Sequence, residues 1–335
     1  MTRSVRSGHD PTPGGARIPG VTPTIVDRAM DATVVPGYTR LGYLARRRGF
    51  DPIPRMDGRT VLITGATSGL GRAAADGFAR LGAQVLVLAR DASRGNRAVG
   101  EIVRATANTD VHLVAGDLSD LTSLRAAAAD VAGRVDALDV LVHNAGALVA
   151  ERTLSGDGIE LTLATNVVGP FALTAQLTPS LRAGAPSRIV SVSSGGMYAQ
   201  SLDVDDLQTE RHPYKGAAVY ARTKRAQIVL TEAWTRRLGD LGISAHAMHP
   251  GWVDTPGIEA SLPRFHKLLG PVLRTPEEGA DTIVWLGAAA EPLRRPGRFW
   301  HDRRERPTHR LPGTATSPED AARLWEACER LTALS

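Results

Sequence analysis

Tyr220 and Lys224, four residues apart, are the residues whose types and spacing point most directly to chemistry. On a helix, this spacing places both side chains on one face. The chain has 40 basic residues but only three lysines, at positions 215, 224 and 267, so a lysine here is an exception. A compact ammonium can lie beneath a phenol ring where a planar guanidinium would not fit. Because a nearby positive charge favours the phenolate, the pair predicts a tyrosine of lowered pKa that gives and takes a proton.

A glycine-rich segment at residues 64–71 reads Thr-Gly-Ala-Thr-Ser-Gly-Leu-Gly. It follows an apolar run of strand length and precedes a stretch with helical periodicity. Glycines let the backbone approach a pyrophosphate, and the N-terminus of the following helix offers free N–H groups and a positive dipole. In this context the segment predicts a dinucleotide-binding turn.

Apolar runs alternate with helical stretches along most of the chain. We expect strands at 60–64, 84–89, 111–115, 140–143, 188–193, 243–248 and 297–300, and helices at 70–81, 94–107, 121–135, 161–183, 217–238 and 276–289. Strands rich in Val, Leu and Ile with helices between them are typical of a buried parallel sheet. The sequence therefore predicts an α/β fold, a Rossmann-type, doubly wound, seven-stranded parallel sheet in a single domain with an N-terminal extension.

Composition divides the chain at residues 23 and 57. Residues 1–23 are rich in Gly, Pro and polar residues, which predicts a disordered tail. Residues 24–57 are expected to form an N-terminal extension with a short amphipathic helix. Residues 58–335 are expected to form the catalytic domain, with a lid at 252–273 and a C-terminal helix that Ser317 caps.

The amphipathic stretch at 38–50 has two interpretations. Leu41 and Leu44 lie close to three consecutive arginines at 46–48. Such a segment either docks on the domain or contacts an anionic membrane surface peripherally.

The net charge of +5 over 335 residues is unevenly distributed. Residues 1–58 carry nine Arg against five Asp, and residues 294–310 carry seven Arg against two acidic residues, which leaves the body at −4. A mildly acidic body argues against a phosphate-tracking surface, so no nucleic-acid partner is expected.

Cysteine content and hydropathy indicate the compartment. Cys328 is the only cysteine, so the chain forms no intrachain disulfide. The sequence has neither an apolar run of membrane-spanning length nor a secretory signal core. We therefore expect a cytoplasmic protein without a transmembrane segment.

The motifs, taken in order, resemble those of the short-chain dehydrogenase/reductase superfamily. They are the glycine spacing at 64–71, Asn-Ala-Gly at 144–146, Tyr-x-x-x-Lys at 220–224 and a Pro-Gly loop at 250–255. The resemblance implies that Tyr220 is the general acid/base and that Ser194, rather than Ser193, holds the carbonyl oxygen. It also implies that Lys224 lowers the pKa of the phenol and that Asn166 positions a water that relays protons from Lys224.

The same resemblance implies cofactor contacts from the glycine-rich turn, the strand ends, the catalytic helix and the Pro-Gly loop. They are Gly65, Thr67, Ser68, Gly69, Leu70, Gly71, Arg72, Arg90, Asp117, Leu118, Asn144, Ala145, Gly146, Tyr220, Lys224, Pro250, Gly251, Val253 and Thr255. No metal is implied.

The end of the second strand indicates which nicotinamide cofactor is used. An acidic residue there would bind the ribose 2′-hydroxyl of NAD, whereas an arginine accommodates the 2′-phosphate of NADP. Arg90 takes this place and Asp91 follows one residue later. Arg72 is a candidate second phosphate contact, and Arg94 is expected to be solvated. We therefore expect NADP(H) in preference to NAD(H).

Within the superfamily, residues 37–335 closely resemble the member-12 branch of the dehydrogenase/reductase proteins, notably at 193–197, 249–257 and 298–303. This implies hydride transfer between nicotinamide and a carbonyl or alcohol, by a carbonyl reductase or alcohol dehydrogenase. The apolar lid and the long insert at 195–219 are expected to wall a pocket for a lipophilic small molecule. Two alternatives stay open: a nucleotide-sugar epimerase or dehydratase, and a non-catalytic dinucleotide-binding scaffold or sensor.

Overall fold

The computed structural model describes residues 27, 30, 35–255, 267 and 269–333. The predicted tail at 1–23 and the centre of the predicted lid, residues 256–266 and 268, lie outside these residues. The predicted boundary between residues 57 and 58 stays a prediction.

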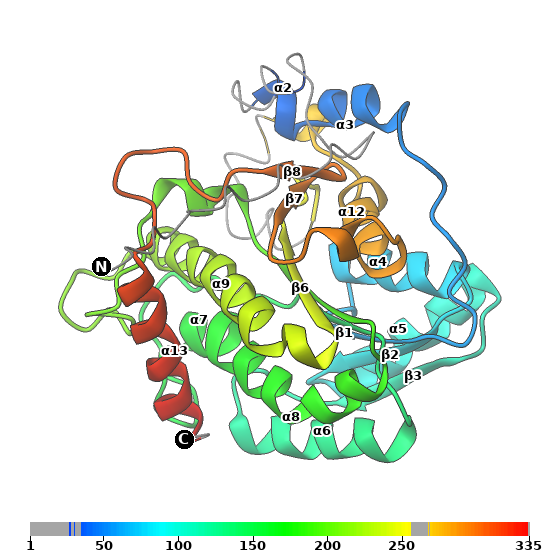
Figure 1. Ribbon diagram of the computed structural model, residues 1–335, viewed down its shortest axis with the longest axis horizontal. Helices are drawn as coiled ribbons and strands as arrows, with labels where there is room; N and C mark the ends of the chain where they lie inside the picture. Colours follow the sequence, from blue (N-terminus) through cyan, green and yellow to red (C-terminus); the bar gives the residue numbers. More distant parts are fainter. Residues whose placement is uncertain (1–26, 28–29, 31–34, 256–266, 268, 334–335) are drawn as a thin grey trace, which may run out of the picture.

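The sheet has the strand order β3-β2-β1-β4-β5-β6-β7-β8 (Figure 1). The strands are β1 (Thr60–Thr64), β2 (Gln84–Ala89), β3 (Val111–Ala115), β4 (Val140–His143), β5 (Ser187–Val192), β6 (Ile243–Met248), β7 (Phe299–His301) and β8 (Arg304–Arg306). The first seven are parallel, and this confirms the predicted doubly wound fold.

The predicted count of seven strands is wrong by one. Strand β8 pairs with β7 in the antiparallel direction through a two-residue turn at Asp302 and Arg303. Both turn residues have positive φ, 51° and 55°. Hairpin turns of this kind usually carry Asn or Gly, so the Asp-Arg pair gave no turn signal in the sequence.

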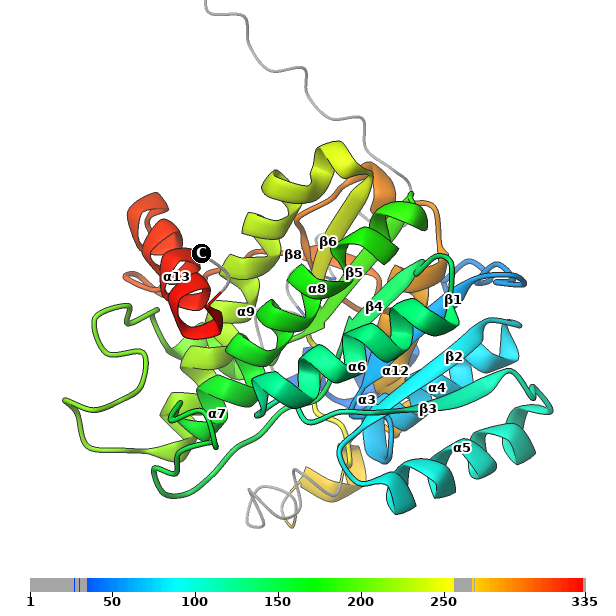
Figure 2. The same cartoon turned by 90° about the horizontal axis from the view of Figure 1, so that it is seen from below.

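Helices cover both faces of the sheet (Figure 2). One layer contains α4 (Gly69–Arg80), α5 (Ala92–Thr106) and α12 (Pro276–Ala288), and the other contains α6 (Leu121–Arg134), α8 (Gly169–Ala183) and α9 (Gly216–Leu238). Alternate residues of β1 serve the two layers, because Val61 and Ile63 belong to one core cluster and Leu62 to the other. Short 3-10 turns occupy Gly195–Ala199, Gly239–Leu241, Gly270–Val272 and Pro292–Arg294.

The helix predicted at 161–183 is interrupted. It consists of α7 (Leu161–Leu163), a π-helical segment (Ala164–Val168) and α8. Pro170 lies in the first turn of α8 and has no N–H, so it cannot donate the i→i−4 hydrogen bond to the carbonyl of Asn166. The break therefore releases a backbone acceptor at a predicted catalytic residue.

The last helix, α13 (Pro318–Thr332), lies beside α9 (Figure 2). As predicted, the Ser317 side chain caps it, accepting a hydrogen bond from the Asp320 N–H at 3.0 Å. Trp325 packs edge-on against Phe171 of α8, with ring centroids 4.8 Å apart. Cys328 is buried on the same helix.

The N-terminal helices α2 (Val35–Tyr38) and α3 (Arg40–Arg47) lie over the loops that follow β6 and β7 (Figure 1). Arg46 donates to Asp27 at 2.5 Å and to Asp302 at 2.7 Å. Arg274 also binds Asp302, at 2.5 Å, and Arg306 binds Asp27, at 2.6 Å. These five residues form the buried ion cluster, in which the two basic flanks of the sequence meet around shared carboxylates.

Helix α3 docks on the domain, which is one of the two interpretations of the amphipathic stretch. It does so through Tyr43 and Arg46, which are 6% and 4% exposed. Leu41 and Leu44 point away from the domain and are 66% and 37% exposed. Within the described ranges, none of the helices is both long and apolar enough to cross a membrane.

Candidate active site

A cleft of about 520 Å³ lies at the carboxyl edge of β1, β2, β3 and β4. Seven of the predicted cofactor residues line it: Gly65, Thr67, Arg90, Asp117, Leu118, Ala145 and Gly146. The lining also includes residues that were not predicted: Leu88, Ala89, Asp91, Arg94, Gly116, Ala147, Leu148, Val149, Leu161 and Thr165. Ligands of doubly wound sheets bind at this edge.

The glycine-rich turn is compact because it packs against the loop after β4. Gly65 has φ +69°, and a Cβ there would lie 2.8 Å from the Cα of Ala145. A Cβ on Gly71 would lie 2.2 Å from Nδ2 of Asn144. The Asn144 amide donates to the carbonyls of Thr64 and Gly65, at 3.1 and 3.2 Å, so Asn144 holds the turn in shape.

The N-terminus of α4 is suited to a phosphate. The neighbouring helices α5 and α6 are capped by the side chains of Asp91 and Asp120, whereas the Ser68 side chain makes no capping hydrogen bond to α4. The first-turn N–H groups of α4 therefore have no side-chain acceptor and can bind an anion beside the cleft. The turn and this helix end together fit the pyrophosphate of a dinucleotide.

Three charged residues after β2, Arg90, Asp91 and Arg94, line the end of the cleft where the adenosine of a dinucleotide is expected. Arg90 and Arg94 are both exposed, so Arg94 is solvated as expected, and both also border the cleft. The carboxylate of Asp91 accepts from the Arg94 N–H at 2.9 Å and so serves as a helix cap. Arg72 does not line the cleft, since it pairs with Asp76 at 3.0 Å and Glu101 at 2.6 Å.

Asp117 and Leu118 lie at the end of β3. The Asp117 carboxylate accepts hydrogen bonds from the N–H and hydroxyl of Ser119, at 2.9 and 2.7 Å. Leu118 is 5% exposed and packs into the core. The loop is thereby held so that both residues border the cleft.

Tyr220, Lys224 and Ser194 meet beyond the other end of the cleft. The Lys224 Nζ lies 5.4 Å from the centroid of the Tyr220 ring, and a Cβ on Gly146 would lie 3.4 Å from Nζ. Ser193 is buried and its hydroxyl donates to the Lys224 carbonyl at 2.9 Å. Ser194 is therefore the serine available to the phenol of Tyr220, whose pKa it acts to lower.

The protonation behaviour of the pair differs from the expectation. Burial raises the pKa of Tyr220 to about 12, with the Ser194 hydrogen bond opposing the rise. Burial also lowers the pKa of Lys224 to about 7. The Lys224 ammonium donates to the Val192 carbonyl at 2.9 Å and to Gln227 Oε1 at 3.2 Å. The expected lowering of the Tyr220 pKa by Lys224 is therefore absent from this arrangement.

Asn166 is fully buried in the π-helical segment. Its amide accepts from the Ala147 N–H at 2.7 Å and donates to the Ala147 carbonyl and the Thr223 hydroxyl. Its backbone carbonyl accepts from Gln227 Nε2 at 2.8 Å. These contacts join the loop after β4 to α9, and the predicted role of Asn166 in positioning a relay water stays a prediction.

The Pro-Gly loop packs against Tyr38 of the N-terminal extension. The Tyr38 ring lies on His249, with centroids 4.5 Å apart, and the Tyr38 carbonyl accepts from the Trp252 N–H at 2.9 Å. His249 Nδ1 accepts from the Gly251 N–H, and burial lowers the pKa of His249 well below its ordinary value. Pro250 accepts from Arg274 through its carbonyl at 3.1 Å.

The last two predicted cofactor residues, Val253 and Thr255, end the described part of this loop. Val253 is 2% exposed and forms an isolated bridge with Arg274, whereas Thr255 is half-buried. The lid residues 256–266 that follow are outside the described structure.

The insert at 195–219 does not line the described cleft. Met197 and Tyr198 are buried against Phe299, and Leu202 and Leu207 pack against the main core. These apolar side chains therefore stabilise the insert, and its expected role as a wall of the substrate pocket stays a prediction.

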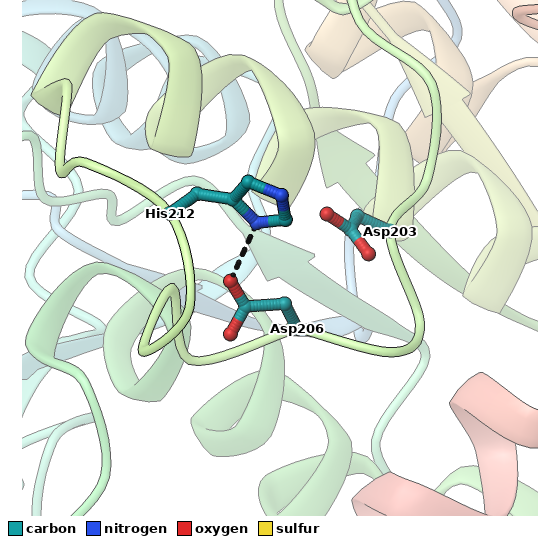
Figure 3. Close-up of side chains that lie close together, drawn as sticks. All are labelled: Asp203, Asp206 and His212. Carbon is teal, nitrogen blue, oxygen red and sulfur yellow. Dashed lines mark hydrogen bonds and ion pairs between the residues drawn. The ribbon is translucent and has the colours of Figure 1, made fainter.

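Asp203, Asp206 and His212 form the one group of potential metal ligands found in the described residues (Figure 3). Asp206 accepts from the N–H groups of Glu210 and Arg211 and from His212 Nδ1 at 2.9 Å. Asp203 lies 3.6 Å from Arg222. These contacts already engage the carboxylates in holding the insert together, so the group carries no metal assignment.

The chain is similar to several known proteins. The family model described as short chain dehydrogenase matches residues 59–263. Dehydrogenase/reductase SDR family member 12 of Bos taurus is 41% identical, covering 88% of this chain and 93% of the relative. Polyprenol dehydrogenase of Mus musculus is 37% identical, covering 86% and 89%. A short chain dehydrogenase from Burkholderia cenocepacia, solved in complex with NADP, has 27% identity and a TM-score of 0.59, covering 73% of this chain and 96% of that one. The chain belongs to the short-chain dehydrogenase/reductase family of oxidoreductases.

Proposed function

We propose that the chain is an NADP(H)-dependent oxidoreductase that interconverts a lipophilic carbonyl compound and its alcohol, with Tyr220 as general acid/base. The observation that carries the proposal is the meeting of Ser194, Tyr220 and Lys224 next to Gly146, which lines the cleft. A dinucleotide in that cleft would extend from Arg90 toward these side chains. The intact set disfavours the non-catalytic alternative.

Each residue has a distinct task in the proposed reaction. The cofactor, when bound, supplies or accepts the hydride. Tyr220 is protonated near neutral pH because burial raises its pKa to about 12, so it can donate a proton to a carbonyl oxygen. Ser194 hydrogen-bonds the same oxygen and stabilises the charge that develops on it. In the reverse direction Tyr220 must first ionise so that its phenolate can accept the proton of the alcohol, and Lys224 would favour the phenolate only while it is itself charged.

The lipophilic substrate class is supported by chemistry and by a relative. A polyprenol dehydrogenase, whose name specifies a long apolar alcohol, is 37% identical to this chain. The phenol of Tyr220 is buried, and burial is the largest cause of its raised pKa, so the site is poorly solvated. We therefore propose aldehydes, ketones and alcohols with apolar tails.

Tyr220→Phe tests the central assignment. The variant keeps the ring but removes the proton donor, so turnover should fall about 10²–10⁴-fold while NADPH binding persists. NADPH consumption over a panel of lipophilic aldehydes and ketones, with binding followed by fluorescence, measures both. Retention of wild-type turnover would show that another group transfers the proton.

The proposed preference for NADP(H) rests on Arg90 and Arg94, since the nearby Asp91 carboxylate is engaged as a cap. Arg90→Ala should weaken NADPH binding about 10-fold or more and leave NADH binding nearly unchanged, because only NADPH carries the 2′-phosphate. Arg104→Ala, on helix α5 shortly after Arg90 in the chain but outside the cleft lining, is the matched control. Equal losses for both cofactors would refute the preference.

We also propose a cytoplasmic protein that contacts an anionic membrane peripherally through α3. The exposed Leu41 and Leu44 share this helix with Arg40 and Arg47, Arg48 follows as its C-cap, and the helix carries no acidic residue. Leucines that insert and arginines that face anionic headgroups are the ingredients of interfacial binding.

Vesicle sedimentation tests this surface. The protein should bind vesicles containing phosphatidylglycerol, weakly bind phosphatidylcholine alone, and lose binding in the double variant Leu41→Ser, Leu44→Ser. Leu311→Ser, which removes a leucine that is 53% exposed elsewhere, is the control. Binding that is insensitive to the α3 variant would exclude the surface.

A further inference from the structure

Gln227 lies one turn after Lys224 on α9, and both side chains are buried, 3% and 2% exposed. Its Oε1 accepts from Lys224 Nζ at 3.2 Å, and its Nε2 donates to the Asn166 carbonyl at 2.8 Å. A single amide group therefore joins the candidate catalytic lysine to the π-helical segment.

The Asn166 carbonyl is free to accept the hydrogen bond from Gln227 because Pro170 has no N–H to donate to it. In an uninterrupted helix the N–H of residue 170 would donate to the carbonyl of residue 166, and proline has none. The break before α8 therefore leaves the Asn166 carbonyl without its helical donor, and Gln227 on α9 supplies a donor in its place.

The amide also determines how many donors Lys224 has left. A protonated lysine has three N–H donors, and the Val192 carbonyl and Gln227 Oε1 take two of them. The remaining donor is available to Tyr220 or a ribose hydroxyl. A neutral amide fixes the ammonium without adding the negative charge by which a carboxylate would raise the pKa.

The surroundings of Lys224 contain few other groups that could set its charge state. Tyr220 faces it from the same helix, Asn166 from the π-helical segment, and Ser193 and the Val192 carbonyl from the end of β5. Burial is the single cause of the lowered pKa, with no carboxylate contributing.

We propose that Gln227 is a positioning residue for Lys224: its amide holds the ammonium beneath Tyr220 and links it to the backbone carbonyl of Asn166. The proposal rests on the proposed function, in which Lys224 assists Tyr220.

Lysine NMR tests the proposal directly, because the chain has only three lysines. The full-length protein is labelled at lysine side chains, and the Lys224 signal is identified by its loss in Lys224→Arg. Gln227→Glu places a carboxylate against the ammonium and should raise the Lys224 pKa by about one unit or more. Gln227→Leu removes the acceptor and should lower it.

Thr235→Val is the matched control, since Thr235 lies two turns further along α9 and its hydroxyl bonds backbone carbonyls away from Lys224. It should leave the Lys224 titration unchanged. An unchanged Lys224 pKa in both Gln227 variants would overturn the proposal. If Gln227→Leu does not fold, the nearly isosteric Gln227→Glu still decides.

Kinetics separate this proposal from the proposed function. Gln227→Leu should lower kcat about 10-fold with little change in the KM of the carbonyl substrate, and the pH profile should shift in the same direction as the Lys224 pKa. If Tyr220→Phe keeps full turnover while the NMR shifts hold, the proposed function fails and the positioning of Lys224 stands. If Tyr220→Phe is inactive and Lys224 titrates identically in all variants, only the role of Gln227 fails.

Discussion

The active-site face of α9 and the buried ion cluster under α3 both place charged groups inside the protein, but in opposite ways. Lys224 is buried against neutral acceptors, and burial lowers its pKa to about 7. Asp302 is equally buried but binds both Arg274 and Arg46. Although burial works to raise the pKa of Asp302, the two guanidinium groups hold it below its ordinary value.

The difference shows that the partner, and not burial alone, decides what a buried charge does. A buried amine without a counter-ion is poised to change protonation near neutral pH, which suits proton transfer. A buried carboxylate between two arginines stays charged and joins segments distant in sequence, here the N-terminal helices and the β7–β8 turn.

The largest effect on stability is expected from a substitution that breaks the buried ion cluster. Asp302→Ala leaves Arg46 and Arg274 buried without this shared partner, and it should lower the free energy of unfolding by about 3–5 kcal/mol. Chemical denaturation measures the change. Asp57→Ala, which removes an exposed partner of Arg55, should leave stability nearly unchanged. Similar losses in the two variants would remove the distinction between paired burial and surface pairing.

Lys224→Met should leave stability intact and reduce activity, in contrast to Asp302→Ala. It replaces a buried amine that has no counter-ion with an apolar side chain of similar length, so the free energy of unfolding at pH 7 should not fall. Turnover should fall about 10²-fold or more. A stability loss as large as that of Asp302→Ala would contradict the assignment of Lys224 to chemistry rather than to structure.

The stability of the protein above pH 7 provides a further test of the buried, unpaired Lys224. Lys224 has a folded pKa near 7, below that of an unfolded lysine at about 10.4, so between these values the unfolded chain binds more protons. Its contribution should make wild type more stable as pH rises from 7 to 9, by at most about 1.4 kcal/mol per unit. Lys224→Met should lack this rise. Parallel curves for the two proteins would argue against the lowered pKa.

A smaller change in stability is expected at acid pH, from Asp302 in the buried ion cluster. Because the folded pKa of Asp302 is lowered, its stabilisation is present above the unfolded carboxyl pKa of about 3.9 and is lost as pH falls further. Wild type should lose about 1 kcal/mol more than Asp302→Asn between pH 5 and pH 3. Denaturation at the two pH values provides the measurement, and an equal loss in the variant would assign the acid sensitivity to other carboxyls.

Much of the fold was predictable because its signals are local. The strand predicted at 60–64 matches β1, and the helix predicted at 276–289 differs from α12 by one residue. Strand β8 was missed because Asp302 and Arg303 adopt positive φ without the usual turn residues. The break at Asn166 was missed because a proline in the first turn of a helix resembles, in sequence, an ordinary helix start.

The candidate site was predictable as a set of residue types and only in part as an arrangement. The Tyr-x-x-x-Lys spacing is sufficient to place Tyr220 and Lys224 on one helix face. Gln227 was overlooked, although its place three residues after Lys224 on the same helix face was a usable signal. The contact of its amide with Asn166 was not predictable, because it depends on how α9 packs against another element.

The sequence by itself determined the alternation of strands and helices, the glycine-rich turn and the order of the motifs, since each follows from periodicity and spacing among neighbouring residues. The tertiary structure alone decided that Leu41 and Leu44 face outward and that Arg46 is buried. It also decided that Lys224 lies against an amide instead of a carboxylate. The physical reason is that burial and charge state depend on the partner, and these partners come from distant parts of the chain or from a neighbouring helix turn that only folding brings into contact.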